Sequence, residues 1–198
     1  TGGRGQFGEV YLRVEPNERG AGFEFVDEVV GGVIPRQYIP AIEKGIREVL
    51  ERGILAGCPI VDVKAAVHDG SYHTVDSSEA AFKIAGGRAF QAAFEQAKPV
   101  LLEPMALIEV TIPSQYMGDV TGNLTGHRGR ILGMDQVGSL QVVKAEIPRA
   151  EVTRYSTELK SMTGGEGSFT LEFSHYAVVP ANVQQEIIAR HQKAREEE

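Results

Sequence analysis

The chain has 198 residues, 42% of them hydrophobic, and a formal net charge of −7 at pH 7. This length suits one large or two small domains, and the hydrophobic fraction excludes a disordered chain. No apolar run approaches the roughly 20 residues that cross a bilayer, so we expect no membrane partner and a cytoplasmic location. We also expect a monomer. The acidic charge taken alone argues against a nucleic-acid-binding protein, because such proteins usually present a basic face. The first residue is Thr1 and not methionine, which suggests a piece of a longer protein.

Cysteine and histidine usage limits the redox and metal chemistry of the chain. Cys58 is the single cysteine, and its apolar surroundings predict a buried, unreactive thiol in a reducing compartment. The five histidines lack the close spacing of metal ligands, so we expect no metal site. They are His68, His73, His127, His175 and His191. The glycine-dense start over residues 2–8 lacks the Gly-Lys-Ser/Thr ending of a phosphate loop, so we expect no nucleotide cofactor within the chain.

The first half predicts two strands, a helix, a third strand and a second helix. Alternation over residues 7–14 and 22–30 predicts two strands that pair as a hairpin. Apolar spacings of three and four over residues 39–50 predict an amphipathic helix ending at Gly53. Residues 59–67 predict a buried strand, and residues 77–97 a helix with two buried stripes, one of phenylalanine and one of alanine. Gly86 and Gly87 in that helix indicate close packing against another backbone.

The segment from Gly70 to Glu79, which joins this strand to this helix, is the most informative part of the sequence. Asp76 followed by Glu79 fits a capping box, with Ser77 as an alternative cap. The helix then begins near residues 75–78 and mounts His73 rigidly in front of it, beyond the body of the domain. An ordinary polar loop is the competing interpretation.

Catalysis by this segment is the less favoured reading. Ser71, His73 and Asp76 have the right types for a catalytic triad, but three residues so close in sequence seldom point at one another. We therefore expect no catalytic residue. A hydrolase that uses His73 is kept as the alternative from another functional class.

The second half predicts a separate domain. Strands over residues 105–112, 129–134, 140–147 and 168–176, with helices over 115–126 and 151–162, follow the order βαββαβ. This order is typical of a ferredoxin-like sheet with both helices on one face. A last helix and an acidic tail follow, so the expected division is 1–103, 104–180 and 181–198, with an α+β fold class.

Several segments, in order and across nearly the whole chain, resemble the fourth and fifth domains of bacterial elongation factor G, a translational GTPase. They are Thr1–Gly8, Gly31–Pro35, Tyr38–Pro40, Asp69–His73, Val75–Glu79, Leu102–Pro104, Tyr116–Val120, Arg128–Gly129 and Ile131–Met134. The resemblance implies a fourth domain with an α/β sandwich and a left-handed crossover, and a ferredoxin-like fifth domain. It also implies a parent protein that binds GTP and Mg²⁺ in a domain absent from these residues.

The resemblance further implies a ribosomal function. Members of the family move tRNA and mRNA by one codon, and they also help a recycling factor to split the subunits. The fourth domain would enter the decoding region with its tip, where a local contact does not require a basic chain. The implied contacts with tRNA or the decoding region are Gly31, Gly32, Ser71, Tyr72 and His73. The resemblance implies that the fifth domain faces large-subunit rRNA. The candidate contacts are His127, Arg128 and Arg130, which form a basic cluster at a glycine hinge, and Arg154; an ordinary solvated loop is the competing interpretation of the cluster.

Three departures from the family pattern suggest a divergent paralogue. Arg154-Tyr155-Ser156-Thr157 stands where members usually carry Gly-Tyr-Ala-Thr, and Gly122-Asn123-Leu124 where they carry Gly-Asp-Leu. Thr163-Gly164-Gly165-Glu166 replaces Thr-Gln-Gly-Arg, so a glutamate stands at a position where an arginine usually faces RNA. A paralogue used for ribosome recycling or protection is therefore the alternative to a translocase.

Overall fold

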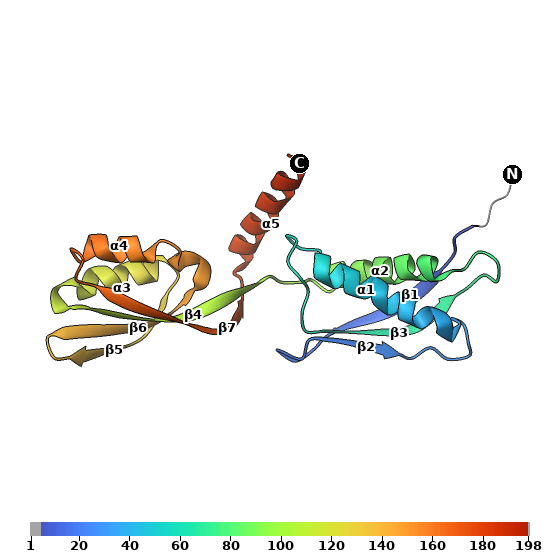
Figure 1. Ribbon diagram of the computed structural model, residues 1–198, viewed down its shortest axis with the longest axis horizontal. Coiled ribbons are helices and arrows are strands. Elements are labelled where there is room, and N and C mark those ends of the chain that lie inside the picture. Colours follow the sequence, from blue (N-terminus) through green and yellow to red (C-terminus); the bar gives the residue numbers. More distant parts are fainter. Residues whose placement is uncertain (1–4, 198) are drawn as a thin grey trace. The chain divides into compact units, whose positions relative to one another are not determined.

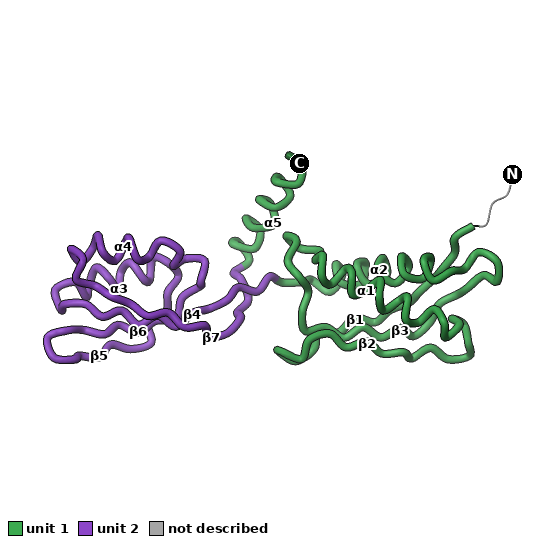
Figure 2. The backbone as a smooth tube through the Cα atoms, in the orientation of Figure 1, with its two compact units in different colours: residues 1–100, 181–198 green, residues 101–180 purple. Residues whose placement is uncertain are grey.

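The computed structural model describes residues 5–197. It divides the chain into two compact units, one of residues 1–100 with 181–198 and one of residues 101–180 (Figure 2). Residues 1–4 of the glycine-dense start lie outside the described residues. No described helix combines the length and the apolar character needed to cross a membrane. The α+β fold class predicted from the sequence is confirmed.

The first unit is a three-stranded sheet with two helices on one face (Figure 1). Its elements are β1 (Glu9–Pro16), β2 (Phe23–Asp27), η1 (Arg36–Tyr38), α1 (Ile39–Arg52), β3 (Val63–Ser71) and α2 (Glu79–Gln96). The strand order is β1-β3-β2, and β3 is antiparallel to β1 and parallel to β2.

The predicted hairpin between the first two strands is wrong. Both β1 and β2 pair with β3, which lies between them. The reason is burial: β3 carries a nearly continuous apolar run, with Ala65, Ala66 and Val67 all buried. A strand of this kind takes the centre of the sheet, whereas β1 and β2, which mix half-buried and exposed residues, suit its edges.

The third strand also lies later in the chain than predicted. Ile60 donates its N–H to the carbonyl of Leu50 and not to a neighbouring strand, and the ladder begins only at Val63. Because β3 continues to Ser71, Gly70 and Ser71 belong to the strand. The loop that follows therefore begins at Tyr72.

Cys58 is exposed, so the prediction of a buried thiol is wrong. Its loop turns through positive φ angles at Ala56 and Gly57. This turn directs Cys58 outward while its neighbours Leu55 and Ile60 stay half-buried. Apolar neighbours in a sequence indicate a nearby core, but the backbone turn decides which side chain faces it.

The two helices of the first unit approach each other at glycines. A Cβ on Gly45 of α1 would collide with the carbonyl oxygen of Lys83 in α2, and a Cβ on Gly86 would lie 2.8 Å from the carbonyl oxygen of Ile42. The close packing predicted from Gly86 and Gly87 is therefore confirmed. Phe82 and Phe90 fill the space beneath, while the alanine stripe of α2 is fully buried only at Ala81.

The second unit has the ferredoxin-like order predicted from the sequence. Its elements are β4 (Leu102–Pro113), η2 (Ser114–Tyr116), α3 (Met117–Gly126), β5 (Arg130–Val137), β6 (Leu140–Pro148), η3 (Arg149–Val152), α4 (Tyr155–Met162) and β7 (Ser168–Val178). The sheet order is β5-β6-β4-β7 with every pair antiparallel, and α3 and α4 cover one face (Figure 1). The last helix, α5 (Ala181–Glu196), is grouped with the first unit.

We predict that Gly45→Ala lowers the free energy of unfolding of the first unit by about 2 kcal/mol, because the added methyl group forces α1 away from α2. This loss opposes the helix propensity of alanine, which alone would stabilise the helix by about 1 kcal/mol. The matched control is Gly122→Ala in α3, where no atom of residues 5–197 lies within 4 Å of the added Cβ. Urea denaturation followed through amide NMR signals of each unit measures both changes. Equal stabilisation by the two substitutions would refute the glycine contact.

Candidate functional site

The predicted site residues of the first unit gather at one end of its sheet. We call this end the tip and define it as residues 28–33, between β2 and η1, and residues 72–78, between β3 and α2. Ile34, which is buried, packs its side chain against Gly70 just below both loops. The tip therefore combines two loops that are about 40 positions apart in the sequence.

A buried serine fixes the second of these loops. The Ser77 hydroxyl donates to the carbonyl oxygen of Phe7 at 2.9 Å and accepts the N–H of His73 at 2.9 Å. Ser77 is 2% exposed. One hydroxyl thus ties the His73 backbone to the residues that lead into β1.

The predicted helix cap is wrong, and the reason lies in the same contacts. Ser78 caps α2, with its hydroxyl accepting the N–H of Ala81 at 3.1 Å. Asp76 instead accepts the N–H of Gly5 at 2.8 Å, and its carbonyl oxygen accepts the N–H of Phe7 at 3.0 Å. Asp76 and Ser77 are therefore occupied in holding the N-terminal segment, and the cap moves to the next serine.

His73 and Asp76 lie together, but Ser71 does not join them. The Nδ1 atom of His73 lies 3.3 Å from the carboxylate of Asp76. Ser71 closes β3, paired with Glu9, and it makes no hydrogen bond to His73 within the described part of the chain. The arrangement therefore lacks the nucleophile–base contact of a catalytic triad.

The first loop of the tip has a glycine pair that faces open space. Gly31 and Gly32 have φ angles of +69° and +70°, and no atom of the described residues lies within 4 Å of a Cβ built on either. Positive φ explains the choice of glycine here, and the open space leaves the backbone accessible to a partner. Val30 beside them is 76% exposed, and Tyr72 in the other loop is 42% exposed.

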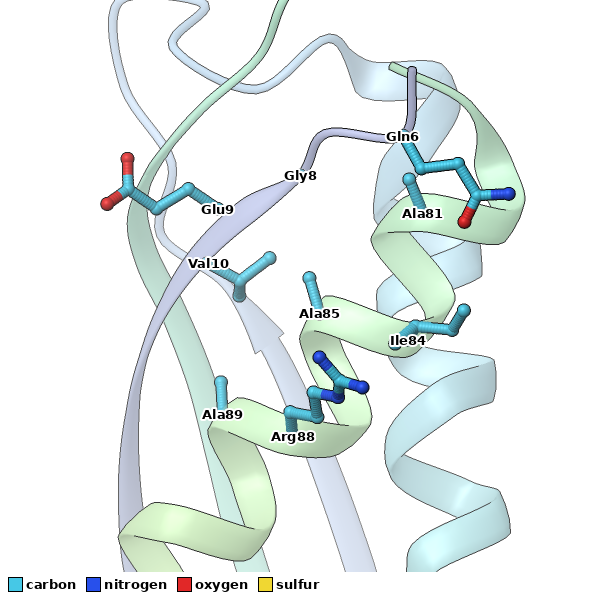
Figure 3. Close-up of a pocket in the computed structure, with 9 residues that line it drawn as sticks. All are labelled: Gln6, Gly8, Glu9, Val10, Ala81, Ile84, Ala85, Arg88 and Ala89. Atoms are coloured by element: carbon cyan, nitrogen blue, oxygen red, sulfur yellow. The ribbon is translucent and has the colours of Figure 1, made fainter. Parts of the chain in front are cut away.

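A groove of about 500 Å³ lies beside the first residues of β1 and along α2 (Figure 3). Ala81, Ala85 and Ala89 form its α2 wall, together with Arg88. In Figure 3 the carboxylate of Glu9 points away from α2, so it does not converge with Arg88. Among residues 5–197, no cluster of His, Cys, Asp and Glu has the arrangement of a metal site.

In the second unit, Arg128 is held by carboxylates. Its Nη atoms donate to both oxygens of Glu103 at 2.9 and 2.7 Å, and its Nε donates to Glu151 at 3.0 Å. These hydrogen bonds, chiefly those to Glu103, raise the pKa of Arg128 above its ordinary value despite partial burial. His127 lies 2.9 Å from Glu158 and 3.5 Å from Glu151. The fold itself therefore compensates the charge of Arg128.

The other two predicted rRNA contacts are more accessible. Arg130 is 73% exposed and bonds Glu146 through one Nη atom, which holds the pKa of Glu146 below its ordinary value. Arg154 is exposed, and within the described part of the chain it has no ion-pair partner. Nothing in the sequence near Arg128 indicated that Glu103 and Glu151 would reach it, because both are more than 20 positions away.

The segments that depart from the expected pattern contain both buried residues, Tyr155 and Thr163, and exposed residues. Tyr155, next to Arg154, is fully buried, and burial raises the pKa of its hydroxyl to about 12. Glu166 is exposed at a turn in which Gly164 and Gly165 have positive φ. The glutamate that replaces the usual arginine is therefore free to face a partner.

Comparisons with known proteins agree with this architecture of an α/β unit followed by a ferredoxin-like unit. Residues 1–98 match the family model for elongation factor G, domain IV, and residues 100–187 match the model for the elongation factor G C-terminus. A crystal structure of a protein from Thermus thermophilus is 49% identical to the chain, with a TM-score of 0.78. The match covers 98% of this chain and 29% of that one.

The chain belongs to the elongation factor G family and comprises its domain IV and its C-terminal domain. The resemblance inferred from the sequence is thus confirmed. These 198 residues contain no GTPase domain.

We predict that Arg128→Ala lowers the free energy of unfolding of the second unit by about 2–3 kcal/mol, because it leaves the largely buried Glu103 without its bidentate partner. Arg130→Ala is the control and should cost no more than about 1 kcal/mol, because Arg130 is 73% exposed and its partner Glu146 keeps its contacts with Ser174 and His175. Urea denaturation of the 198-residue chain, followed through NMR signals of the second unit, measures both. If the two substitutions lower the free energy of unfolding equally, the ion pairs of Arg128 do not contribute specially to the stability of the second unit.

Proposed function

We propose that this chain is the ribosome-binding C-terminal part of a translation elongation factor that promotes GTP-dependent movement of tRNA and mRNA. The observation that carries the proposal is the match of both units, in order, to two domains of one translation factor family. The parent protein would bind GTP and Mg²⁺ in its own nucleotide-binding domain and act in the cytoplasm as a monomer. These 198 residues would contribute contacts and no catalytic group.

The geometry of the tip supports a role as a rigid probe. The loop that carries His73 is pinned by Ser77 and Asp76 to the N-terminal segment. A loop held in this way can transmit a displacement of its domain to whatever it touches, because little of the motion is lost in the loop. We propose that Gly31, Gly32, Ser71, Tyr72 and His73 contact tRNA or the decoding region.

For the second unit we propose contact with large-subunit rRNA through its accessible cations. Arg130 and Arg154 are the exposed candidates. Arg128 and His127 would stabilise the fold beneath this surface, because both already pair with carboxylates of the same unit. A guanidinium already bound to two carboxylates is a poor ligand for phosphate.

A second proposal, favoured by the exposed Glu166, is a paralogue that serves ribosome recycling or protection. A carboxylate repels the phosphates of rRNA where an arginine would bind them. Such a change would weaken or redirect one contact without altering the fold. The two proposals share the ribosome as partner and differ in the step that the factor supports.

We predict that His73→Ala in the parent factor slows translocation about 5- to 10-fold, which corresponds to one lost hydrogen bond of about 1 kcal/mol. GTP hydrolysis should be unchanged, because the substitution lies outside the nucleotide-binding domain. The matched control is His68→Ala, an exposed histidine of β3 outside the tip, which should leave both rates unchanged. Single-turnover translocation and ribosome-stimulated GTP hydrolysis measure the two effects.

The same variants separate the competing functions. A recycling factor would lose subunit splitting on His73→Ala and would show little translocation even as the wild type. A hydrolase would lose a reaction that the 198-residue chain performs alone. Wild-type translocation unaffected by His73→Ala would contradict the proposed role of the tip.

A further inference from the structure

The imidazole of His73 accepts hydrogen bonds from its own loop. Its Nδ1 atom receives the backbone N–H of Val75 at 3.3 Å and the backbone N–H of Asp76 at 3.2 Å. The loop forms a single turn that closes where the N–H of Ser77 meets the carbonyl oxygen of His73 at 3.0 Å. The ring therefore caps this turn in the way that an asparagine or serine side chain caps the start of a helix.

This capping fixes which nitrogen carries the proton. A nitrogen that accepts two N–H groups has its lone pair directed at them and cannot donate, so the proton of the neutral ring is on Nε2. Asp76 is the one charged group that the described structure places against Nδ1, at 3.3 Å. If Nδ1 carried a proton, the ring could interact with the carboxylate of Asp76, but such a half-exposed pair contributes little to stability. The ring would then lose both hydrogen bonds from the backbone N–H groups.

The other nitrogen has no partner among the described residues. The side chain of His73 is 55% exposed. Its Nε2–H is therefore a hydrogen-bond donor, held in a fixed position and available to a partner of the tip.

The described segments around His73 carry no positive charge. Residues 5–9, 28–35 and 69–79 contain no lysine or arginine; Arg36 follows in η1, and Arg4 lies outside the described residues. The same segments contribute five carboxylates, which belong to Glu9, Glu28, Asp69, Asp76 and Glu79. Glu28 is paired with Arg13 of β1 at 2.8 Å, so four carboxylates remain without an arginine or lysine partner among the described residues. A phosphate at the tip would meet like charge without a counter-charge from these segments, which disfavours it.

Three large hydrophobic side chains of the tip are exposed, together with the polar Thr74. Val30 is 76% exposed, Val75 is 59% exposed and Tyr72 is 42% exposed. Such a surface suits the uncharged parts of an RNA, which are the ribose rings and the edges and faces of bases. It does not suit the phosphate backbone.

We propose that His73 acts at the tip as an uncharged hydrogen-bond donor through Nε2–H, and that its partner is an uncharged acceptor of RNA, a ribose oxygen or an acceptor on a base edge. The RNA partner rests on the proposed function, whereas the tautomer rests on the loop geometry alone. The backbone amides of Val75 and Asp76 are positioning groups, because they hold the ring with its donor outward.

The tautomer is tested first, on the 198-residue chain without ribosomes. Two-bond ¹H–¹⁵N correlation spectra of the imidazole, recorded at a pH where the ring is neutral, identify the protonated nitrogen. The signals are assigned by their absence in His73→Gln. We expect protonation at Nε2 only. A ring protonated at Nδ1, or a rapid mixture of the two forms, would overturn the proposal.

The partner is tested next, in the parent factor, by variants that place a donor or an acceptor at each ring position. In His73→Gln the side-chain amide reaches the position of Nε2 and supplies a donor there, whereas in His73→Asn it reaches only the position of Nδ1. We expect the glutamine variant to translocate within about 3-fold of wild type, and the asparagine variant to lose about 5- to 10-fold, as alanine does. We expect His73→Lys to be no faster than His73→Ala.

Salt separates an uncharged acceptor from a phosphate. The ratio of the wild-type rate to the His73→Ala rate should stay constant as the salt concentration rises, because a neutral hydrogen bond is little screened. A ratio that falls with salt, or a fast lysine variant, would identify a phosphate and overturn the inference. His73→Ala could leave translocation unchanged although the spectra show the proton on Nε2. In that case the proposed function of the tip and the RNA acceptor would both be refuted, whereas the inferred tautomer would be retained.

Discussion

The tip depends on the two hydrogen bonds of the Ser77 hydroxyl. It bonds the carbonyl oxygen of Phe7 and the N–H of His73 at the same time, so one buried atom joins the start of the chain to the loop that carries the imidazole. The carboxylate of Asp76 contributes a further hydrogen bond by accepting the N–H of Gly5. Because these contacts restrain the backbone on both sides of His73, the orientation of the ring follows from the fold. A surface histidine on an unrestrained loop would sample many rotamers and would lose entropy on contact.

The glycine contact between α1 and α2 provides the base for both loops of the tip. One loop leads into α1 through η1, and the other leads directly into α2. Backbone contact at Gly45 and Gly86 fixes the spacing of the two helices and therefore the spacing of the loops. The phenol of Tyr38, just before α1, stacks on Phe82 with ring centroids 4.8 Å apart, which ties the start of α1 to the core. A contact made of glycines is stiff because no side chain can adjust between the backbones.

The sequence predicted those features that depend on local pattern, and it failed for those that depend on distant partners. Periodicity located α1, α2 and every element of the second unit, and Gly86 with Gly87 indicated the helix contact. The supposed hairpin failed because strand pairing depended on the burial of β3, and the supposed cap failed because Asp76 and Ser77 bind residues 70 positions away. Arg128 is bound by Glu103, and no local pattern encodes the proximity of two residues 25 positions apart. For the site, the residues of the tip could be recognised from the family resemblance, but the hydrogen bonds that orient His73 could not.

The central claim is that the tip is rigid because Ser77 holds it. ¹⁵N relaxation of the 198-residue chain and of Ser77→Ala measures this directly, through the order parameters of the amides of His73, Asp76 and Ser77 or its replacement. The account predicts wild-type values near those of β3, about 0.85, and a fall at all three positions in the variant. Wild-type values below about 0.6, or values that Ser77→Ala leaves unchanged, would contradict it.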